Sequence, residues 1–250
     1  MTRHFETLDS TNDEAMRLAL AGAPAFDAVS AASQTAGRGR HGRAWASPPG
    51  VGLYVSVILR PRVAPDLLPL STLLAGIAAA EAIRGTSGAD AKIKWPNDIL
   101  INGRKTAGLL CEADFTSAVP IVIAGLGVNV NTLPQDLPAR AIYPATSIFA
   151  ETQLRNDPAT LLDAWIERLR FWIASIESDP AASALISRWN ELDALRGEHL
   201  RVSLADGTAI EGVESGTDPE GHLLLRLSDG ALFPVMAGDI AKTSAPRAAE

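Results

Sequence analysis

The spacing of apolar residues predicts four helices. The motif Thr11-x-x-Glu14 is a capping box, and apolar residues then recur at helical spacing until Gly22, so the first helix is expected over about 11–21. Residues 67–84 combine Leu, Ala and Ile with few polar interruptions, which is typical of a largely buried helix. Two later helices, at 158–176 and 181–195, carry aromatic residues that we expect in the core: Trp165, Phe171, Trp172 and Trp189.

Strands are predicted where β-forming residues alternate in polarity or form short apolar runs between turn residues. Asn102-Gly103 between two such runs is a strong hairpin signal. In the first part of the chain we expect strands at 51–59, 92–95, 99–101, 106–112 and 118–130. After Arg196-Gly197 the pattern changes to short strands separated by Asp-Gly turns, at 200–204, 209–213, 222–227 and 231–236. The sequence therefore predicts a mixed helical and stranded domain over 1–195 and a small all-β domain over 196–250.

The length of the chain is compatible with one large and one small domain, and its composition excludes several classes of protein. The chain has 250 residues, of which 47% are hydrophobic and 20% charged, as in soluble globular proteins. It has neither an apolar leader at its start nor an uncharged run of about 20 residues, so we expect neither export nor a membrane span. Cys111 is the single cysteine, which excludes an intrachain disulfide and a thiolate metal cluster. A cytoplasmic protein is the expectation.

Charge is distributed unevenly along the chain. The net charge of −7 argues against a protein that coats nucleic acid. Between Asp27 and Asp66, however, there is no acidic residue, and the segment contains five arginines: Arg38, Arg40, Arg43, Arg60 and Arg62. A basic segment in an acidic protein suggests a site for a small anion.

The segment 37–42 reads Gly-Arg-Gly-Arg-His-Gly and formally matches a dinucleotide-binding fingerprint. That fingerprint requires a helix directly after the glycines. Pro48 and Pro49 follow too closely for such a helix, so the dinucleotide interpretation fails. A glycine- and arginine-rich loop remains, in which backbone N–H groups and guanidinium forks suit a carboxylate or phosphate. Taken alone, this segment favours a merely solvated basic loop over a ligand site.

Two further segments combine charged or amide side chains with turns. Lys94 and Asp98 precede the predicted hairpin, and Lys105 and Gly108 follow it. Lysine neutralises anions, and Asp98 is a candidate ligand for Mg²⁺; a surface hairpin with an ion pair is the alternative. The segment 125–131 places glycines in a buried strand, where they suggest a close approach by another group or simply a turn. The histidines lack metal-ligand spacing, and no local motif for a Ser-His-Asp or Cys-His arrangement is present.

Five motifs occur together and in order: residues 10–12 (Ser-Thr-Asn), 34–45, 94–98 (Lys-Trp-Pro-Asn-Asp), 105–108 and 127–129. In this combination the chain closely resembles the biotin protein ligases over nearly its whole length. The resemblance implies an α+β fold, with a mixed sheet backed by helices and a C-terminal SH3-like barrel. It implies that biotin and ATP, with Mg²⁺, give biotinyl-5′-AMP, and that biotin then passes to a lysine of a biotin carboxyl carrier protein. Some relatives carry an N-terminal repressor domain, for which residues 1–9 leave no room, so no repressor role is expected.

The resemblance also implies roles for individual residues. Lys105 and Arg40 are expected to be catalytic. The expected biotin-binding residues are Ser10, Thr11, Asn12, Gln34, Arg38, Gly39, Arg40, Lys105 and Gly108. The expected ATP- and adenylate-binding residues are Arg38, Arg40, Arg43, Trp45, Lys94, Asn97, Asp98, Lys105 and Asn129, with Asp98 toward Mg²⁺. Lys242 and Arg247 are the basic residues near the C-terminus that relatives suggest for an adenylate contact, although neither aligns well. A homodimer is one option for the assembly.

Two other functions remain open at this point. A lipoate–protein ligase has a similar fold and chemistry, although the arginine-rich loop and the segment 94–98 favour biotin. A non-catalytic nucleic-acid-binding module that uses the arginine loop is a more distant alternative, and the sequence pI of about 5.2 speaks against it.

Overall fold

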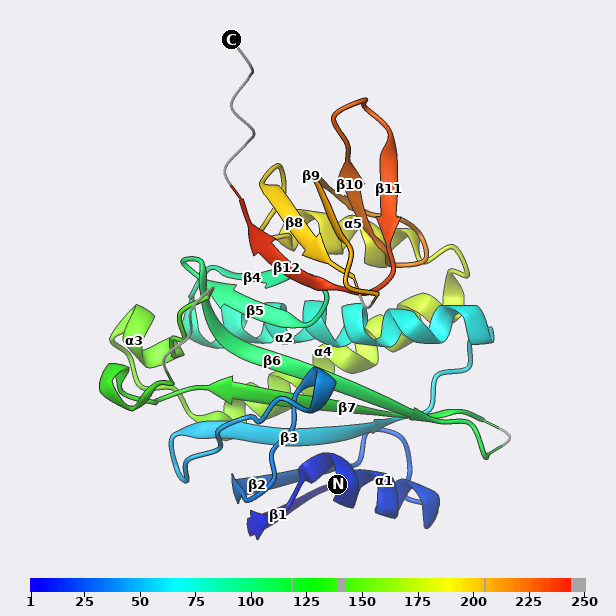
Figure 1. Ribbon diagram of the computed structural model, residues 1–250. Coiled ribbons are helices and arrows are strands. Elements are labelled where there is room, and N and C mark those ends of the chain that lie inside the picture. The colour runs from blue at the N-terminus through cyan, green and yellow to red at the C-terminus, as the bar shows by residue number, and fades with distance from the viewer. Residues whose placement is uncertain (118, 139–142, 205, 244–250) are drawn as a thin grey trace.

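A seven-stranded mixed sheet forms the centre of the molecule in the computed structural model, which describes residues 1–117, 119–138, 143–204 and 206–243 (Figure 1). Its order is β1-β2-β3-β7-β6-β5-β4. The strands are β1 (Thr2–Leu8), β2 (Ala28–Gln34), β3 (Gly52–Leu59), β4 (Ala91–Lys94), β5 (Asp98–Ile101), β6 (Arg104–Asp114) and β7 (Ile121–Asn129). β1 and β2 are parallel, and every other neighbouring pair is antiparallel.

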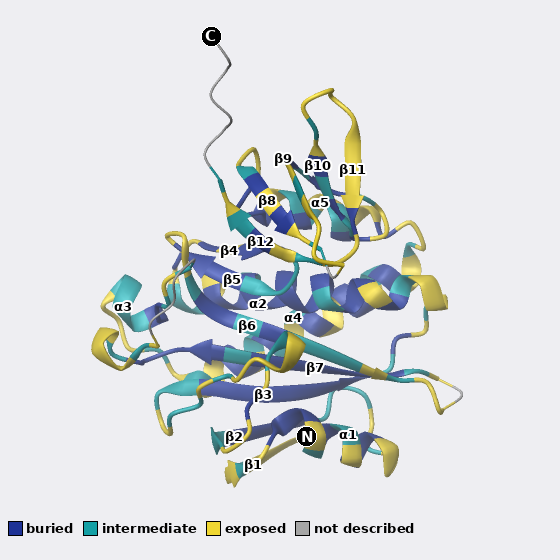
Figure 2. Ribbon diagram, viewed as in Figure 1, coloured by how far each residue is buried: buried dark blue, intermediate teal, exposed yellow. Residues whose placement is uncertain are grey.

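The larger hydrophobic core lies on one face of this sheet. It is covered by α2 (Ser71–Ser87), α4 (Pro158–Ser178) and α5 (Ser183–Leu192), while α3 (Ile148–Thr152) is a short helix after β7. Alternate residues of β3, such as Val55 and Val57, pack there with Ile77 of α2 and Trp165 of α4, and all four are buried (Figure 2). The stretch Pro65–Ser87 is long and apolar enough to cross a membrane, but most of it is buried, as in the core helix of a soluble protein.

The opposite face of the sheet is only partly covered. α1 (Thr11–Leu20) packs its Ala15 and Leu18 on Val29, Ile58 and Ile123, which forms a small second core. In Figure 1 the helix lies beside β2 and β3 and runs in the direction of β3. The sheet beyond its N-terminus is therefore available for a cavity.

A second sheet of five antiparallel strands follows the helices. Its order is β11-β10-β9-β8-β12, with β8 (His199–Ser203), β9 (Ala209–Thr217), β10 (Leu223–Arg226), β11 (Leu232–Val235) and β12 (Asp239–Lys242). The indole N–H of Trp95 donates to the Gly221 carbonyl at 3.1 Å, and Trp95 is only 3% exposed. Leu200 and Leu225 of this sheet belong to the same hydrophobic cluster as α2. The two sheets thus share one core, and a domain boundary between 195 and 196 stays a prediction.

The fold class is confirmed, as are the four long helices and the hairpin between β5 and β6. Asn102 and Gly103 both have positive φ, at 50° and 73°, as a tight two-residue hairpin turn requires. The expected strand at 118–130 is β7, and Ala118 lies outside the described residues. β1, β2 and β12 are additional strands that the sequence patterns did not indicate.

Two local predictions are wrong. Thr11 does not cap α1, because Ser10 occupies the N-cap without a capping side-chain hydrogen bond and the Thr11 hydroxyl donates to Gln34. Glu14 pairs instead with Arg17 at 2.6 Å. Phe171 is not a core residue: it is 53% exposed and stacks under the guanidinium of Arg168.

Candidate active site

A cavity of about 110 Å³ lies where α1 leaves the sheet uncovered. It is bounded by the start of α1, the segment 37–45, the β4–β5 turn, β6 and β7, and residues 238–240 before and in β12. The cavity brings together these residues expected from the sequence: Ser10, Thr11, Asn12, Gln34, Arg38, Gly39, Arg40, Arg43, Trp45, Lys94, Asn97, Asp98, Lys105 and Gly108.

Asn129 lies in a small neighbouring cavity of about 20 Å³. Trp45 and Lys105 line both cavities, so they form the partition between them. The Asn129 amide is 9% exposed and donates to the Thr146 carbonyl at 2.9 Å, which fixes its orientation. The expected residues therefore occupy two adjoining spaces that are separated by an indole and an ammonium group.

Glycines in β6 and β7 form the floor of the larger cavity. A Cβ atom at Gly127 would lie 2.5 Å from Cε2 of Trp45, and one at Gly108 would lie 3.0 Å from Cζ3 of the same indole. A Cβ atom at Gly125 would collide with the Asn12 amide oxygen. Of the two interpretations of these strand glycines, close approach is confirmed: the approaching groups are Trp45 and Asn12.

The start of α1 is held by a polar network. The Thr11 backbone N–H and hydroxyl both reach Oε1 of Gln34, at 2.9 and 3.2 Å, and the Gln34 amide donates to Ser47 at 3.1 Å. Ser56, completely buried on β3, lies 2.8 Å from the Thr11 hydroxyl and 2.6 Å from Oδ1 of Asn12. These contacts orient the polar end of the cavity before any ligand enters it.

The arginine loop, residues 37–45, lies over the cavity. It contains two guanidinium groups that are paired with carboxylates and one that is not. Arg38 donates to both carboxylate oxygens of Asp13, at 2.7 and 2.6 Å, and Arg43 pairs with Asp239 at 2.5 Å. The Arg40 guanidinium makes no hydrogen bond or ion pair to any described residue, and only the backbone carbonyl of Arg40 accepts, from the Arg43 N–H at 3.2 Å. Burial lowers the pKa of Arg40, against the raising effect of nearby Asp239. An anion in the cavity would provide Arg40 with the counter-charge that it lacks.

Asp98 lies between two lysines at the other side of the cavity. Its carboxylate is 2.5 Å from Nζ of Lys105 and 3.3 Å from Nζ of Lys94. Burial alone would raise the pKa of Asp98, but the two lysine charges outweigh it and the net pKa is below the usual range. Burial lowers the pKa of Lys94 despite the Asp98 charge. The site thus holds two cations and one anion whose side chains are largely buried, at 10% exposed for Lys94, 14% for Asp98 and 19% for Lys105.

This arrangement does not suit Asp98 as a resident Mg²⁺ ligand. Both of its oxygens are bound by ammonium groups, which compete directly with a cation. Among the described residues that line the cavity, the other carboxylate is Asp239, which is paired with Arg43. Mg²⁺ is therefore treated below as part of the MgATP substrate, held by phosphate oxygens.

Several residues of the site carried no recognisable sequence signal. Asp239 lines the cavity, and Ser56 and Glu112 contact it indirectly through hydrogen bonds to Asn12; the three lie on separate strands, and no motif links them. Of the two basic residues considered near the C-terminus, Lys242 pairs with Glu198 at 3.0 Å and does not line the cavity, and Arg247 lies outside the described residues.

Comparison with known proteins agrees with the geometry. The family model of the biotin/lipoate A/B protein ligases matches residues 4–129. The bifunctional ligase/repressor BirA of Bacillus subtilis is 36% identical over 232 residues, which cover 91% of this chain and 70% of the relative. The chain belongs to the biotin protein ligase family.

Other members of the biotin protein ligase family match over most of their length. The biotin–[acetyl-CoA-carboxylase] ligase of Paracoccus denitrificans is 34% identical over 87% of this chain and 91% of its own. The biotin protein ligase of Aquifex aeolicus, solved in complex with biotin and ATP, has a TM-score of 0.81 and 25% identity, covering 98% of this chain and 99% of that chain.

Proposed function

We propose that this protein is an ATP-dependent biotin–protein ligase with two half-reactions. In the first, a carboxylate oxygen of biotin attacks the α-phosphorus of ATP, and the bond to the β,γ-phosphates breaks to release pyrophosphate. In the second, the uncharged amine of an acceptor lysine attacks the acyl carbon of biotinyl-5′-AMP. The acyl–oxygen bond to AMP breaks, and the amine loses its proton to form the amide.

The observation that carries this proposal is the pair of adjoining cavities that share Trp45 and Lys105. A reaction that joins an acyl group to a nucleotide needs two binding spaces that meet at a cation. Two anions must approach within bonding distance, and fixed positive charges offset their repulsion. Lys105 lies at that meeting point and would exchange its contact with Asp98 for the incoming carboxylate or phosphate.

The remaining residues divide between the two spaces. We place the biotin rings at the polar end of the larger cavity, against Ser10, Thr11, Asn12 and Gln34, with Gly108 in the floor. Arg38, Gly39 and Arg40 would cover the acyl chain and the adenylate, and Arg43, Lys94, Asn97 and Asp98 would lie toward the phosphates. The adenine would stack against Trp45 and contact Asn129 in the smaller cavity.

The chain supplies no nucleophile in this mechanism. Burial raises the pKa of the Cys111 thiol to about 12, which leaves it unreactive near neutral pH. Both nucleophiles come from the substrates, first a carboxylate and then an amine. The contribution of the protein is positioning, charge neutralisation and exclusion of water from the reactive anhydride.

Partners and location are part of the same proposal. The acceptor is a biotin carboxyl carrier protein of a carboxylase, and the reaction takes place in the cytoplasm without nucleic acid or membrane. We also propose that the protein associates into a homodimer. Analytical ultracentrifugation with and without biotin and ATP would measure its mass in solution.

The decisive experiment is incubation of the protein with ATP, Mg²⁺ and biotin, followed by mass spectrometry of the complex. The expected product is tightly held biotinyl-AMP, and addition of carrier protein should convert it to a biotinylated lysine. A parallel incubation with lipoate should give little adenylate. Lipoyl-AMP in place of biotinyl-AMP would favour the lipoate ligase alternative, and no adenylate with either acid would refute the proposal.

A further inference from the structure

The side-chain amide of Asn12 is almost fully occupied within the protein. Its Nδ2 donates to the Leu110 carbonyl at 3.2 Å and to Oε2 of Glu112 at 2.6 Å, and its Oδ1 accepts from Ser56 at 2.6 Å. An amide has two N–H donors and two oxygen lone pairs, so a single lone pair remains for a ligand. The reversed amide would set its oxygen against two acceptors. Glu112 and Leu110 therefore determine which face Asn12 presents to the cavity.

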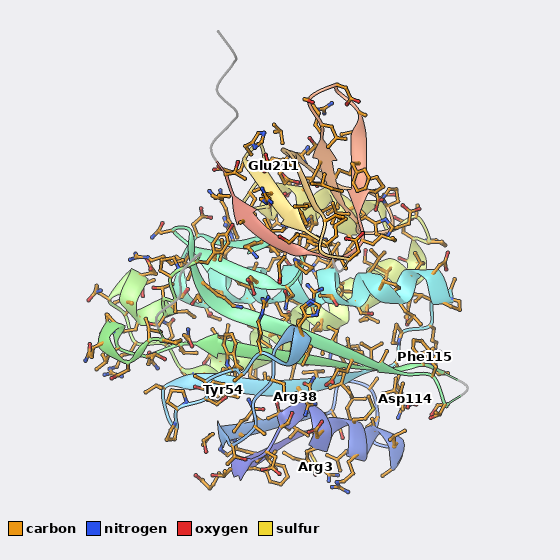
Figure 3. All side chains as sticks on the ribbon, viewed as in Figure 1. Arg3, Arg38, Tyr54, Asp114, Phe115 and Glu211 are labelled. Atoms are coloured by element: carbon orange, nitrogen blue, oxygen red, sulfur yellow. The ribbon has the colours of Figure 1, made fainter. Side chains whose placement is uncertain are left out.

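The same carboxylate reaches the arginine loop. Oε1 of Glu112 lies 3.4 Å from Nη2 of Arg38, whose guanidinium is otherwise bound to Asp13 of α1. Arg38 lies over α1, next to the sheet (Figure 3). Glu112 thus contacts the polar end of the cavity through one oxygen and the loop above it through the other.

The backbone around these residues strengthens the link. Glu112 is on β6 two residues after Leu110, so the carboxylate and the carbonyl that bind Asn12 belong to one rigid strand. The loop is closed on itself by hydrogen bonds from Gly39 N–H to the Arg43 carbonyl at 2.6 Å and from Trp45 N–H to the Gly37 carbonyl at 2.8 Å. Movement of Arg38 therefore moves the loop as a unit.

We propose that Glu112 is a positioning residue for biotin binding, which fixes the Asn12 amide and couples it to the arginine loop through Arg38. This inference rests on the proposed function. Both contacts of Glu112 need an acceptor oxygen, and a glutamine at this position has one acceptor oxygen and one NH₂ group, which only donates. Glu112→Gln keeps the volume of the side chain but sets a donor against either Asn12 or Arg38.

The test compares Glu112→Gln with the wild type and with Glu211→Gln. The control makes the same isosteric change at a carboxylate that pairs with Arg201 at 3.0 Å on the C-terminal sheet. We expect Glu112→Gln to weaken biotin binding about tenfold, measured by calorimetry without ATP. The KM for biotin should rise by a similar factor, with kcat at saturating biotin within about threefold of wild type. Trypsin should cut the loop faster after Arg38, Arg40 or Arg43.

The outcomes separate this inference from the proposed function. An unchanged biotin Kd and an unchanged rate of loop cleavage in Glu112→Gln would overturn the positioning role, even if the enzyme is fully active. A fall in kcat with an unchanged biotin KM would also overturn it, since that would place Glu112 in the chemical step. Absence of biotin binding in wild type and in Glu211→Gln would instead overturn the proposed function. The thermal midpoint of Glu112→Gln should stay within about 2 °C of wild type, which excludes a general loss of structure.

Discussion

Replacement of Glu214 by glutamine should remove a large part of the pH dependence of stability. Glu214 of β9 is 2% exposed, and Asp193, at the end of α5, is 7% exposed. The Leu195 N–H donates to one oxygen of Asp193 at 2.9 Å, and the Gly216 N–H donates to one oxygen of Glu214. The remaining oxygens, Oδ2 of Asp193 and Oε2 of Glu214, are buried without a hydrogen-bond partner among the described residues, and a proton held by Glu214 would relieve the repulsion between the two groups. Arg196 and Lys92 are the nearby cations, and they offset only part of the repulsion.

The sign and size of the effect follow from the pKa of Glu214. Burial, followed by the charge of Asp193, raises this pKa to about 8 from the ordinary 4.5. Between these two values the folded protein holds a proton that the unfolded chain has lost, so the free energy of unfolding decreases as pH rises. The slope reaches about 1.4 kcal/mol per pH unit. From pH 6 to pH 8 this amounts to roughly 2–3 kcal/mol, or several degrees in the thermal midpoint.

Glutamine imitates the protonated carboxyl group. Its oxygen accepts from the Gly216 N–H and its Nε2 donates to Asp193 without any titration. The assay is urea unfolding at half-unit steps from pH 5 to pH 9, with Glu211→Gln, an exposed change on the same strand, as control. Glu214→Gln should match wild type near pH 5 and be more stable above pH 8. Parallel profiles for the variant and wild type would show that Glu214 holds no extra proton in the folded protein.

Three further changes test the active site. Lys105→Ala should slow biotinyl-AMP formation at least about 100-fold, because the cation common to both cavities is lost; normal pyrophosphate release would contradict this. Arg40→Gly should release the adenylate about tenfold faster and allow it to label unintended lysines, and an unchanged off-rate after dilution would count against the role of Arg40. Gly127→Ala should raise the KM for ATP about tenfold, because the added Cβ atom would displace the Trp45 indole. The control is Gly85→Ala, whose added Cβ atom would have nothing within 4 Å and should leave the KM for ATP unchanged. Equal KM values for the two variants would argue against stacking of the adenine on Trp45.

The spacing of apolar residues is sufficient to predict helices and strands that bury a regular apolar face. It is insufficient for strands that are stabilised mainly by hydrogen bonds to neighbouring strands. α2 and the β5–β6 hairpin were predicted because their apolar runs and turn residues are local signals. β1 is an edge strand with mostly exposed side chains, and β2 consists largely of small residues. Both strands depend on hydrogen bonds to neighbours distant in sequence, which no local pattern encodes.

The same limit applies to the site. The arginine loop and Lys105 could be predicted from charge and glycine content, whereas Gln34 was expected only from the resemblance to the biotin protein ligases; all of them line the cavity. Ser56 is an ordinary polar residue in an alternating strand, and Glu112 resembles any carboxylate at a strand end. Their importance comes from the register of β3, β6 and β7, which places them beside Asn12. A single sequence gives no means of deriving that register.

The common core of the two sheets has a thermodynamic consequence. Separation of the C-terminal sheet would expose Trp95 and the leucines of β8 and β10 to water, and would also break the hydrogen bond between the Trp95 indole N–H and the Gly221 carbonyl. Because that cost is spread over the whole contact, neither part gains by melting first. Heating should therefore produce a single cooperative transition, with equal calorimetric and van't Hoff enthalpies, where an independently folded appendage would produce two.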